Sequence, residues 1–307
     1  MIGRSARSRA AVLIIAAFTF TGCFLQQATP SPSPTPTPTL TAAPTTTRPR
    51  FELSTYEYAL QTKGKIRSAV RDDAAPMSSR SGATYQGLEP DIAREIARAI
   101  WGPNDDPETH IEWVSVDAST RVSALTSNQA DITLAGLVIT DDQKKVIDLS
   151  DTYLKTGQRL LVKKTNDQIK DLSDVASGEQ TVCAVRGSTA VDNIRKITNN
   201  GAKILLLDTL EFCQQALASG AADAITADEL VLVAIVAKDP SMKVVVKPFT
   251  DDRLGIGIKK TAAGDRTGFL DFVNTALLKI VADRTWAKIY TQRLGSLTGD
   301  TKQIPTD

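Results

Sequence analysis

The chain has 307 residues, of which 36 are basic and 35 are acidic, so its formal net charge is +1. This balance gives no electrostatic basis for binding nucleic acid or an acidic membrane surface. A hydrophobic content of 42% with 5% aromatic residues is typical of a globular α/β protein, and the single histidine argues against His-based triads and His-rich metal sites.

The first residues carry the pattern of an export signal. Arg4, Arg7 and Arg9 precede the uncharged run 10–20, which is too short to span a bilayer. Cys23 follows Gly22 in "FTGC", which resembles a bacterial lipobox and implies cleavage before Cys23 and lipidation of its thiol. A plain secretory signal with a chance cysteine is the alternative. We expect a signal peptide over 1–22 and an extracytoplasmic, lipid-anchored protein.

A Pro- and Thr-rich linker is expected over 23–50. Within it, "ATPSPSPTPTPTLTAAPTTTRPR" alternates Pro with Thr or Ser, a composition that favours extended polyproline II and builds no core. At ~3.1 Å per residue this segment reaches up to roughly 70 Å. Such a spacer holds the domain that follows away from a membrane.

Strand and helix patterns alternate from about residue 51 onward. Strands are predicted at 65–70, 110–116, 130–135, 146–149, 180–185, 202–207, 222–226 and 254–260. Helices are predicted at 89–101, 119–127, 189–197, 210–218, 227–237 and 269–280. In the first of these helices Ile92, Ile96 and Ile100 repeat every four residues. This alternation predicts a mostly parallel α/β architecture, and a globular length of ~255 residues favours two lobes.

Three cysteines are available for pairing. If Cys23 is lipidated, Cys183 and Cys213 remain in an exported, oxidising setting that favours a disulfide. Closing a loop of about 30 residues would stabilise the fold by roughly 3–4 kcal/mol in the chain-entropy model. Two buried free thiols are the alternative.

No catalytic or cofactor motif stands out. His110 at a strand start is interpreted as structural, and "LGIGIKK" at 254–260 lacks the third glycine of a dinucleotide loop. "PNDDPE" at 103–108 is interpreted as a solvated loop rather than a calcium site. We expect no metal, no cofactor and no enzymatic activity.

The order of several short motifs resembles the extracytoplasmic solute-binding proteins of family 3, which serve amino-acid ABC importers. They are "YQGLEPDIAREIA", "ALTSNQADITLAGLVITDDQKKVIDLSDTY", "GQRLLVKK", "VCAVRGST", "CQQALASGAADAITAD" and "RLGIGIKK", in register over about residues 57–297. The cysteine-containing motifs are particularly similar to glutamate-type binding proteins, in which the two cysteines are paired. This resemblance implies a Cys183–Cys213 disulfide.

The resemblance also implies a two-lobe periplasmic-binding-protein fold of type II that closes around one ligand. Its two hinge crossovers are expected near Lys155–Thr156 and Thr250–Asp251. The first lobe then comprises 51–155 plus 251–300, the second lobe 156–250, and the tail 301–307.

Two ligand contacts follow from the resemblance and suit a zwitterion. Asp228 of "DAITAD" stands where the family accepts the ammonium group, although it is equally placed to cap the following helix. Thr189 of "RGST" matches a residue that binds the α-carboxylate at a helix N-terminus. Thr189 and Asp192 also form the pattern of an ordinary capping box.

Three arginines indicate an acidic ligand such as glutamate or aspartate. Arg71 and Arg121 match arginines of acidic-amino-acid binders, and Arg186 would add a third cation. Taken singly, each arginine is better explained as a solvated surface residue, and it is the three together, set against Asp228, that favour an anionic ligand.

One motif departs from the family. Gln143 stands where "T-x-x-R" supplies the arginine that grips the α-carboxylate, while Gly136 and Val138 replace residues that donate hydroxyl or backbone contacts. Either Arg121 and Arg186 take over this contact, or the ligand lacks a standard α-amino-acid head group.

The expected function is a monomeric, lipid-anchored receptor that captures a small polar solute and delivers it to an ABC permease. Glu89, Asp91, Lys144 and Lys145 are interpreted by default as solvated surface charges, and docking to the permease is the alternative role for them. A sensor of the same fold, or an exported prephenate or arogenate dehydratase-like enzyme, is the alternative.

Overall fold

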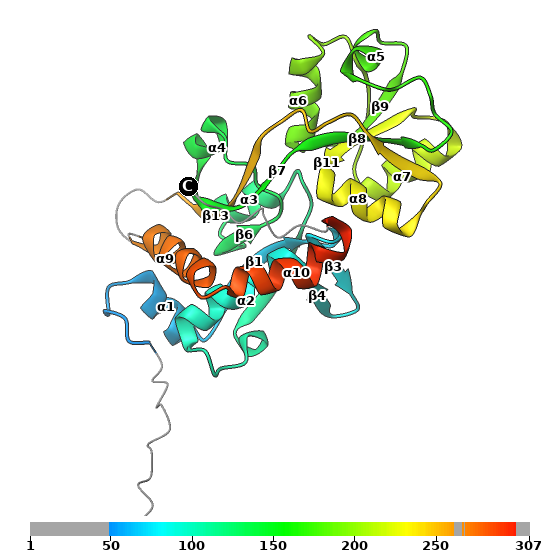
Figure 1. Ribbon diagram of the computed structural model, residues 1–307. Coiled ribbons are helices and arrows are strands. Elements are labelled where there is room, and N and C mark those ends of the chain that lie inside the picture. Colours follow the sequence, from blue (N-terminus) through cyan, green and yellow to red (C-terminus); the bar gives the residue numbers. More distant parts are fainter. Residues whose placement is uncertain (1–48, 261–265, 267, 299–307) are drawn as a thin grey trace, which may run out of the picture. The chain divides into compact units, whose positions relative to one another are not determined.

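The structure is a computed structural model that describes residues 49–260, 266 and 268–298 (Figure 1). The expected signal peptide at 1–22, the lipidation site Cys23, nearly all of the linker and the tail at 301–307 lie outside the described residues. Within the described part of the chain, no helix is both long and apolar enough to cross a membrane. The strands of this part form two five-stranded sheets, which define two lobes, and one small three-stranded sheet.

The first lobe is built on a sheet with the strand order β5-β1-β6-β13-β7. Its strands are β1 (Ile66–Arg71), β5 (Ile111–Val116), β6 (Ile132–Leu134), β7 (Ile147–Thr156) and β13 (Asp252–Lys259). β1 runs parallel to β5 and β6, whereas β13 runs antiparallel to β6 and β7. The glycine-containing segment "LGIGIKK" is therefore part of a strand, as predicted.

Helices from both ends of the described chain cover this sheet. They are α1 (Tyr56–Lys63), α2 (Leu88–Trp101), the short 3-10 helix η1 (Pro107–Thr109), α3 (Arg121–Thr126), α4 (Asp141–Val146), α9 (Phe269–Ala282) and α10 (Thr285–Thr298). A small antiparallel sheet of β2 (Asp73–Ala74), β3 (Ser78–Ser81) and β4 (Thr84–Gln86) joins β1 to α2. In α2, Ile92, Ile96 and Ile100 are fully buried, as their spacing predicts.

The second lobe is built on a sheet with the strand order β10-β9-β11-β8-β12. Its strands are β8 (Gln158–Lys163), β9 (Thr181–Val185), β10 (Lys203–Leu207), β11 (Ala224–Asp228) and β12 (Met242–Val245). Its helices are α5 (Leu172–Ala176), α6 (Thr189–Ile197), α7 (Leu210–Ser219) and α8 (Glu229–Lys238). β9 runs parallel to β10 and β11, whereas β8 runs antiparallel to β11 and β12.

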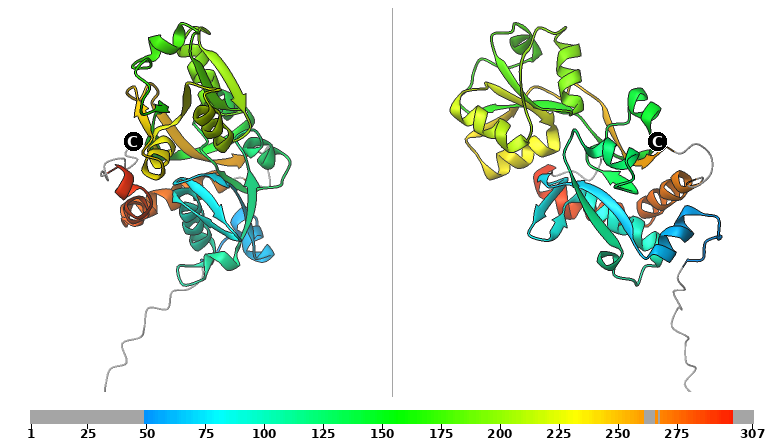
Figure 2. Two further views of the ribbon diagram at one scale, coloured as in Figure 1. Left: turned by 90° about the vertical axis from the view of Figure 1, so that its right-hand side faces the viewer. Right: turned by 180° about the vertical axis from the view of Figure 1, so that it is seen from behind.

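Both sheets are mixed, which differs from the mostly parallel arrangement expected from the alternation. The reason is that the chain crosses between the sheets twice. The chain passes from the first lobe to the second through β7 and Gly157, and it returns to the first lobe between Val245 and β13. The outgoing strand β7 and the returning strand β13 therefore pair antiparallel. In the views of Figure 2 the blue, cyan, orange and red segments gather around the first sheet, and the green-yellow and yellow segments form the second. The two-lobe α/β class with two crossovers is confirmed.

Residues 130–150 differ in detail from the predicted strand, loop and strand. β6 ends at Leu134, and Val138 only makes an isolated bridge to Leu254. The segment "TDDQKKV" then forms the helix α4, in which the Thr140 hydroxyl accepts a hydrogen bond from the Gln143 amide at 3.2 Å. A threonine cap, acids in the first turn and lysines in the last turn suit a helix of this length.

A disulfide joins the sheet of the second lobe to a covering helix. Cys183 of β9 and Cys213 of α7 are paired, with their Cα atoms 5.6 Å apart and both side chains fully buried. The expected disulfide is therefore confirmed.

The two lobes also contact each other outside the crossovers. α10 contacts both α2 of the first lobe and α8 of the second, and α7 contacts β2. Beside the cleft, a Cβ atom built on Gly187 would lie 2.7 Å from the Cα atom of Ser119. The lobes are thus closed on each other in this structure.

Candidate ligand-binding cleft

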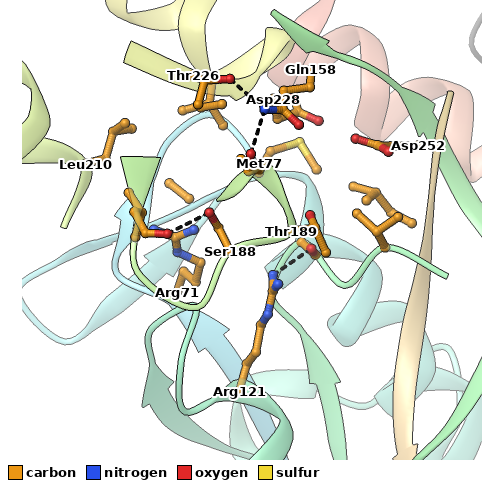
Figure 3. A pocket seen from close by; sticks show the side chains of 18 of the residues that line it. Arg71, Met77, Arg121, Gln158, Ser188, Thr189, Leu210, Thr226, Asp228 and Asp252 are labelled. Carbon is orange, nitrogen blue, oxygen red and sulfur yellow. Dashed lines mark hydrogen bonds between the residues drawn. The ribbon is translucent and has the colours of Figure 1, made fainter. Parts of the chain in front are cut away.

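A cavity of about 100 Å³ lies between the two lobes, with space for several water molecules or one small solute. Among its polar lining residues are Arg71, Glu89, Arg121, Gln158, Ser188, Thr189, Thr226, Asp228 and Asp252. Figure 3 shows Arg121 reaching in from one side, with Asp228 and Asp252 along the other. The cavity therefore carries charges of both signs.

Arg121 is a buried cation at the start of α3. Its side chain is 4% exposed, and its Nη1 atom donates to the carbonyl oxygens of Ala135 at 2.7 Å and Gly136 at 2.6 Å. Its Nε atom is buried and has no hydrogen-bond partner among the described residues. No carboxylate of these residues lies within 4.0 Å of the guanidinium nitrogens. Burial, helped by nearby Arg71, lowers the pKa of Arg121 to about 10, so the group remains cationic at neutral pH. A buried, unpaired cation is suited to hold an anionic ligand group.

Glu89 lies behind Arg121 and was misjudged from the sequence. It is fully buried rather than exposed, together with its neighbours Leu88 and Pro90 in the first turn of α2. Its Oε1 atom accepts hydrogen bonds from the Tyr153 hydroxyl at 2.6 Å and from the Gly136 amide at 2.7 Å. Burial raises the pKa of Glu89. Glu89 therefore holds the same glycine whose carbonyl group holds Arg121.

The other residues interpreted as surface charges divide into two kinds. Asp91 is only partly exposed, because its carboxylate pairs with Arg94 at 2.8 Å and with Arg293 at 2.6 Å. Lys144 and Lys145 on α4 are exposed, as expected.

Arg71 ends β1 and lines the cavity, but its charge is largely compensated. Its Nε and Nη2 atoms donate to the two carboxylate oxygens of Asp73 at 2.8 and 2.9 Å. Such a two-point pairing fixes the guanidinium plane and leaves one nitrogen for another partner. Arg71 therefore contributes less net charge to the cavity than the sequence suggested.

Two aspartates form the acidic side of the cavity. Asp228 ends β11 and caps α8, and its carboxylate accepts a hydrogen bond from the Leu230 amide at 2.8 Å. Asp252 begins β13, and its carboxylate accepts a hydrogen bond from the Thr250 hydroxyl at 2.9 Å. Burial raises the pKa of Asp228 to about 7 and also raises that of Asp252. The capping role foreseen for Asp228 is confirmed, and its place in the cavity is compatible with a second role.

Thr189 lines the cavity at the first turn of α6. The helix is capped by Ser188, whose side chain makes no capping hydrogen bond and instead donates to the carbonyl oxygen of Val185 at 2.7 Å. The capping box predicted for Thr189 and Asp192 is therefore wrong. Because no side-chain oxygen occupies the first-turn amides, an anionic group can approach them.

Gln158 positions this helix and was missed in the sequence. Its Nε2 atom donates to the carbonyl oxygen of Ala190 at 3.0 Å and to the Thr226 hydroxyl at 2.6 Å (Figure 3). Its Oε1 atom accepts from the Asn193 amide group at 3.0 Å. The one sequence signal for a role of Gln158 in the cleft is its position directly after the first crossover.

The structure brings together most, but not all, of the predicted ligand-binding residues. Those that line the cavity are Arg71, Arg121, Gly136, Val138, Thr189 and Asp228. Gln143 on α4 and Arg186 do not belong to this lining. Arg186 is exposed, and its Nε atom pairs with Asp208 at 2.9 Å. Apolar contacts come from Ala74, Met77, Val138, Val185, Leu210, Val231 and Leu254.

In the described part of the chain, no group of three or more His, Cys, Asp or Glu side chains is arranged to hold a metal ion.

Comparison with known proteins identifies the family. Residues 66–296 match the model of the bacterial extracellular solute-binding proteins, family 3. The chain is 32% identical over 234 residues to an ABC transporter glutamine-binding protein of Bacillus subtilis, covering 76% of this chain and 82% of that protein. It is 30% identical over 218 residues to a glutamate-binding protein of Corynebacterium glutamicum, covering 69% and 72%.

A solved structure of an ancestral arginine-binding protein bound to glutamine is also similar. It superposes with a TM-score of 0.67 at 30% identity and covers 76% of this chain and 98% of that one. These relatives are named for binding rather than for catalysis, and they do not single out the glutamate-type subgroup. The chain belongs to the bacterial extracellular solute-binding proteins of family 3.

Proposed function

We propose that this protein is an extracytoplasmic receptor that closes around one free amino acid and delivers it to an ABC transporter. The carrying observation is the buried, unpaired guanidinium of Arg121 facing a cavity whose other side presents Asp228. A free amino acid carries a carboxylate and an ammonium group, which complement these two charges.

In this proposal the α-carboxylate of the ligand binds between Arg121 and the first turn of α6 at Thr189. Arg121 would thereby replace the family arginine whose position Gln143 occupies. The ammonium group binds at Asp228, with Asp252 nearby. Residues from both lobes then contact one ligand, so binding stabilises the closed arrangement.

For the ligand side chain we propose an uncharged polar group, with glutamine as the first candidate. Arg186 is outside the cavity and Arg71 is paired with Asp73, while Glu89 and Asp252 add negative charge. The relatives named for glutamine support this choice. An acidic side chain is the second candidate, because Arg71 retains one guanidinium nitrogen that could meet a carboxylate.

The test is isothermal titration of the purified protein with the twenty amino acids and prephenate. We expect glutamine to bind with a dissociation constant in the micromolar range or below and more tightly than glutamate. Tighter binding of glutamate would favour the acidic alternative. Absence of heat with every amino acid, or turnover of prephenate, would overturn the proposal.

We further propose that Cys23 carries a lipid that anchors the protein outside the cytoplasmic membrane, supported by the "FTGC" motif alone. Replacement of Cys23 by Ser should release the protein from the membrane fraction of the producing cells. Retention of this variant in the membrane fraction would contradict the lipid anchor without affecting the ligand proposal.

A further inference from the structure

The two aspartates of the cavity come from different lobes. Asp228 lies at the end of β11 in the sheet of the second lobe, and Asp252 is the first residue of β13 in the sheet of the first lobe. Both line the same cavity (Figure 3). Asp228 pairs with Gln158 and Asp252 pairs with Thr156, on either side of Gly157, so the strands at the crossover themselves hold the two aspartates near each other.

No cation compensates this pair within the described residues, where neither Asp228 nor Asp252 takes part in an ion pair within 4.0 Å. Neutral groups donate to both carboxylates, with the Leu230 amide bound to Asp228 and the Thr250 hydroxyl bound to Asp252. Two carboxylates that share an enclosed site disfavour full ionisation of both.

The charged and titratable groups around the pair do not relieve it. Glu229 follows Asp228 on α8 and lies 3.8 Å from Arg159, and Asp251 precedes Asp252 at the crossover. From β7, the hydroxyl of Tyr153 donates to Glu89 rather than to the pair, and the pKa of Tyr153 is raised, chiefly by burial. The cations Arg71 and Arg121 line the same cavity, but within the described residues Arg71 is paired with Asp73 and neither arginine lies within 4.0 Å of the pair.

We propose that Asp228 and Asp252 form an acid pair that holds one proton in the empty receptor and releases it to the solvent when the ammonium group of the ligand binds. This inference rests on the proposed function of the cleft. The exchange balances in charge, because one ammonium group enters as one proton leaves. The O–H bond of the protonated carboxyl breaks, its electron pair stays on the carboxylate, and the proton passes to water or buffer.

The direction of the pH dependence follows from this exchange. Burial, with Glu229 and Asp252 adding to it, raises the pKa of Asp228 to about 7 in the empty cleft. An ammonium group favours the ionised carboxylate and lowers that pKa, so protonation competes with the ligand as the pH falls. If the pKa of Asp228 is near 7 in the empty cleft and well below 6 in the complex, proton binding competes with ligand binding at low pH. The affinity for the ligand is then about tenfold weaker at pH 6 than at pH 8.

The experiment is isothermal titration of the protein with L-glutamine, or with L-glutamate if glutamine does not bind. It is run at pH 6, 7 and 8 in pairs of buffers that differ in ionisation enthalpy. We expect release of roughly 0.9, 0.5 and 0.1 protons per ligand, respectively. Binding without proton release at any of these values would overturn the acid pair. Absence of binding by any amino acid would instead overturn the proposed function.

A variant tests the role of the second carboxylate. In Asp252→Asn the remaining acid loses its charged neighbour, so proton release at pH 7 should fall below the wild-type value of roughly 0.5 protons per ligand. The control Asp167→Asn removes an exposed carboxylate, with a side chain 86% exposed, on the loop after β8. It should leave proton release unchanged. Equal proton release by Asp252→Asn and the wild type would show that Asp252 is not part of the pair.

Discussion

Arg121 and Glu89 meet at one residue, Gly136, whose carbonyl group accepts from the arginine and whose amide donates to the glutamate. The two charged side chains therefore depend on one short backbone segment after β6. This arrangement holds the guanidinium of Arg121 in a fixed place before any ligand arrives, which reduces the entropy lost on binding.

Replacement of Arg121 by Ala should weaken ligand binding strongly. Loss of one partner of a buried, charged contact typically costs ~2–5 kcal/mol, which is ~30-fold to several thousand-fold in dissociation constant. Isothermal titration measures the effect, and circular dichroism checks that the variant is folded. Arg186→Ala serves as a matched control, because this exposed arginine lies outside the cavity lining. Equal losses in the two variants would contradict the assignment.

Glu89→Gln should alter stability in a pH-dependent way. The pKa of Glu89 is raised by burial, so the native state binds its proton more tightly than the unfolded state. The wild type should therefore lose stability relative to Glu89→Gln as the pH rises above about 4.3, by ~1.4 kcal/mol for each unit of the pKa difference. Urea unfolding of both proteins between pH 4 and 8 measures this. A difference that is constant with pH would contradict a buried, titrating Glu89.

At the scale of elements, the disulfide connects α7 to β9 beneath the cleft. α7 contributes Leu210 to the cavity and contacts β2 of the first lobe. The covalent link thus holds an element that takes part in closure.

Replacement of both Cys183 and Cys213 by Ala should lower the free energy of unfolding by roughly 3–4 kcal/mol, because the linked residues are 30 positions apart. Urea unfolding in the presence and absence of a reductant measures the change. A reductant should destabilise the wild type but not the double variant. Equal sensitivity of both proteins to the reductant would argue against this bond.

For the molecule as a whole, closure of the lobes depends on a close approach of backbones at Gly187. This residue has a φ of 72°, and a Cβ atom on it would lie 2.7 Å from the Cα atom of Ser119 in the other lobe. A side chain at Gly187 therefore opposes the closed arrangement as well as straining the backbone.

Gly187→Ala should weaken ligand binding at least ~10-fold by favouring an open arrangement. Gly220→Ala is the matched control, because Gly220 has a φ of 83° but no atom within 4 Å of the added Cβ. Both variants should lose ~1–2 kcal/mol of stability from backbone strain, but the control should keep its affinity. Thermal unfolding and isothermal titration separate the two effects. Unchanged affinity in Gly187→Ala would show that this contact does not limit closure.

The sequence by itself determined the elements with strong local patterns. The four-residue spacing in α2 and the polar and apolar pattern of α6 predicted helices that the structure confirms. The order of motifs predicted the two-lobe fold, and the export pattern together with the cysteine count predicted the Cys183–Cys213 bond. These features depend on neighbours along the chain or on motifs that a family shares, so they can be predicted from the sequence without the tertiary structure.

The tertiary structure decided the charge of the cleft. Glu89 lies inside the first lobe, where its carboxylate accepts from Tyr153 and Gly136, whereas Arg186 lies outside the cavity and pairs with Asp208 at the surface. Asp252 lines the same cavity as Asp228 because it is the first residue of β13, the strand with which the chain re-enters the first lobe. Whether a charged side chain faces a ligand depends on burial and on the approach of two lobes, and neither quantity is carried by the local sequence pattern.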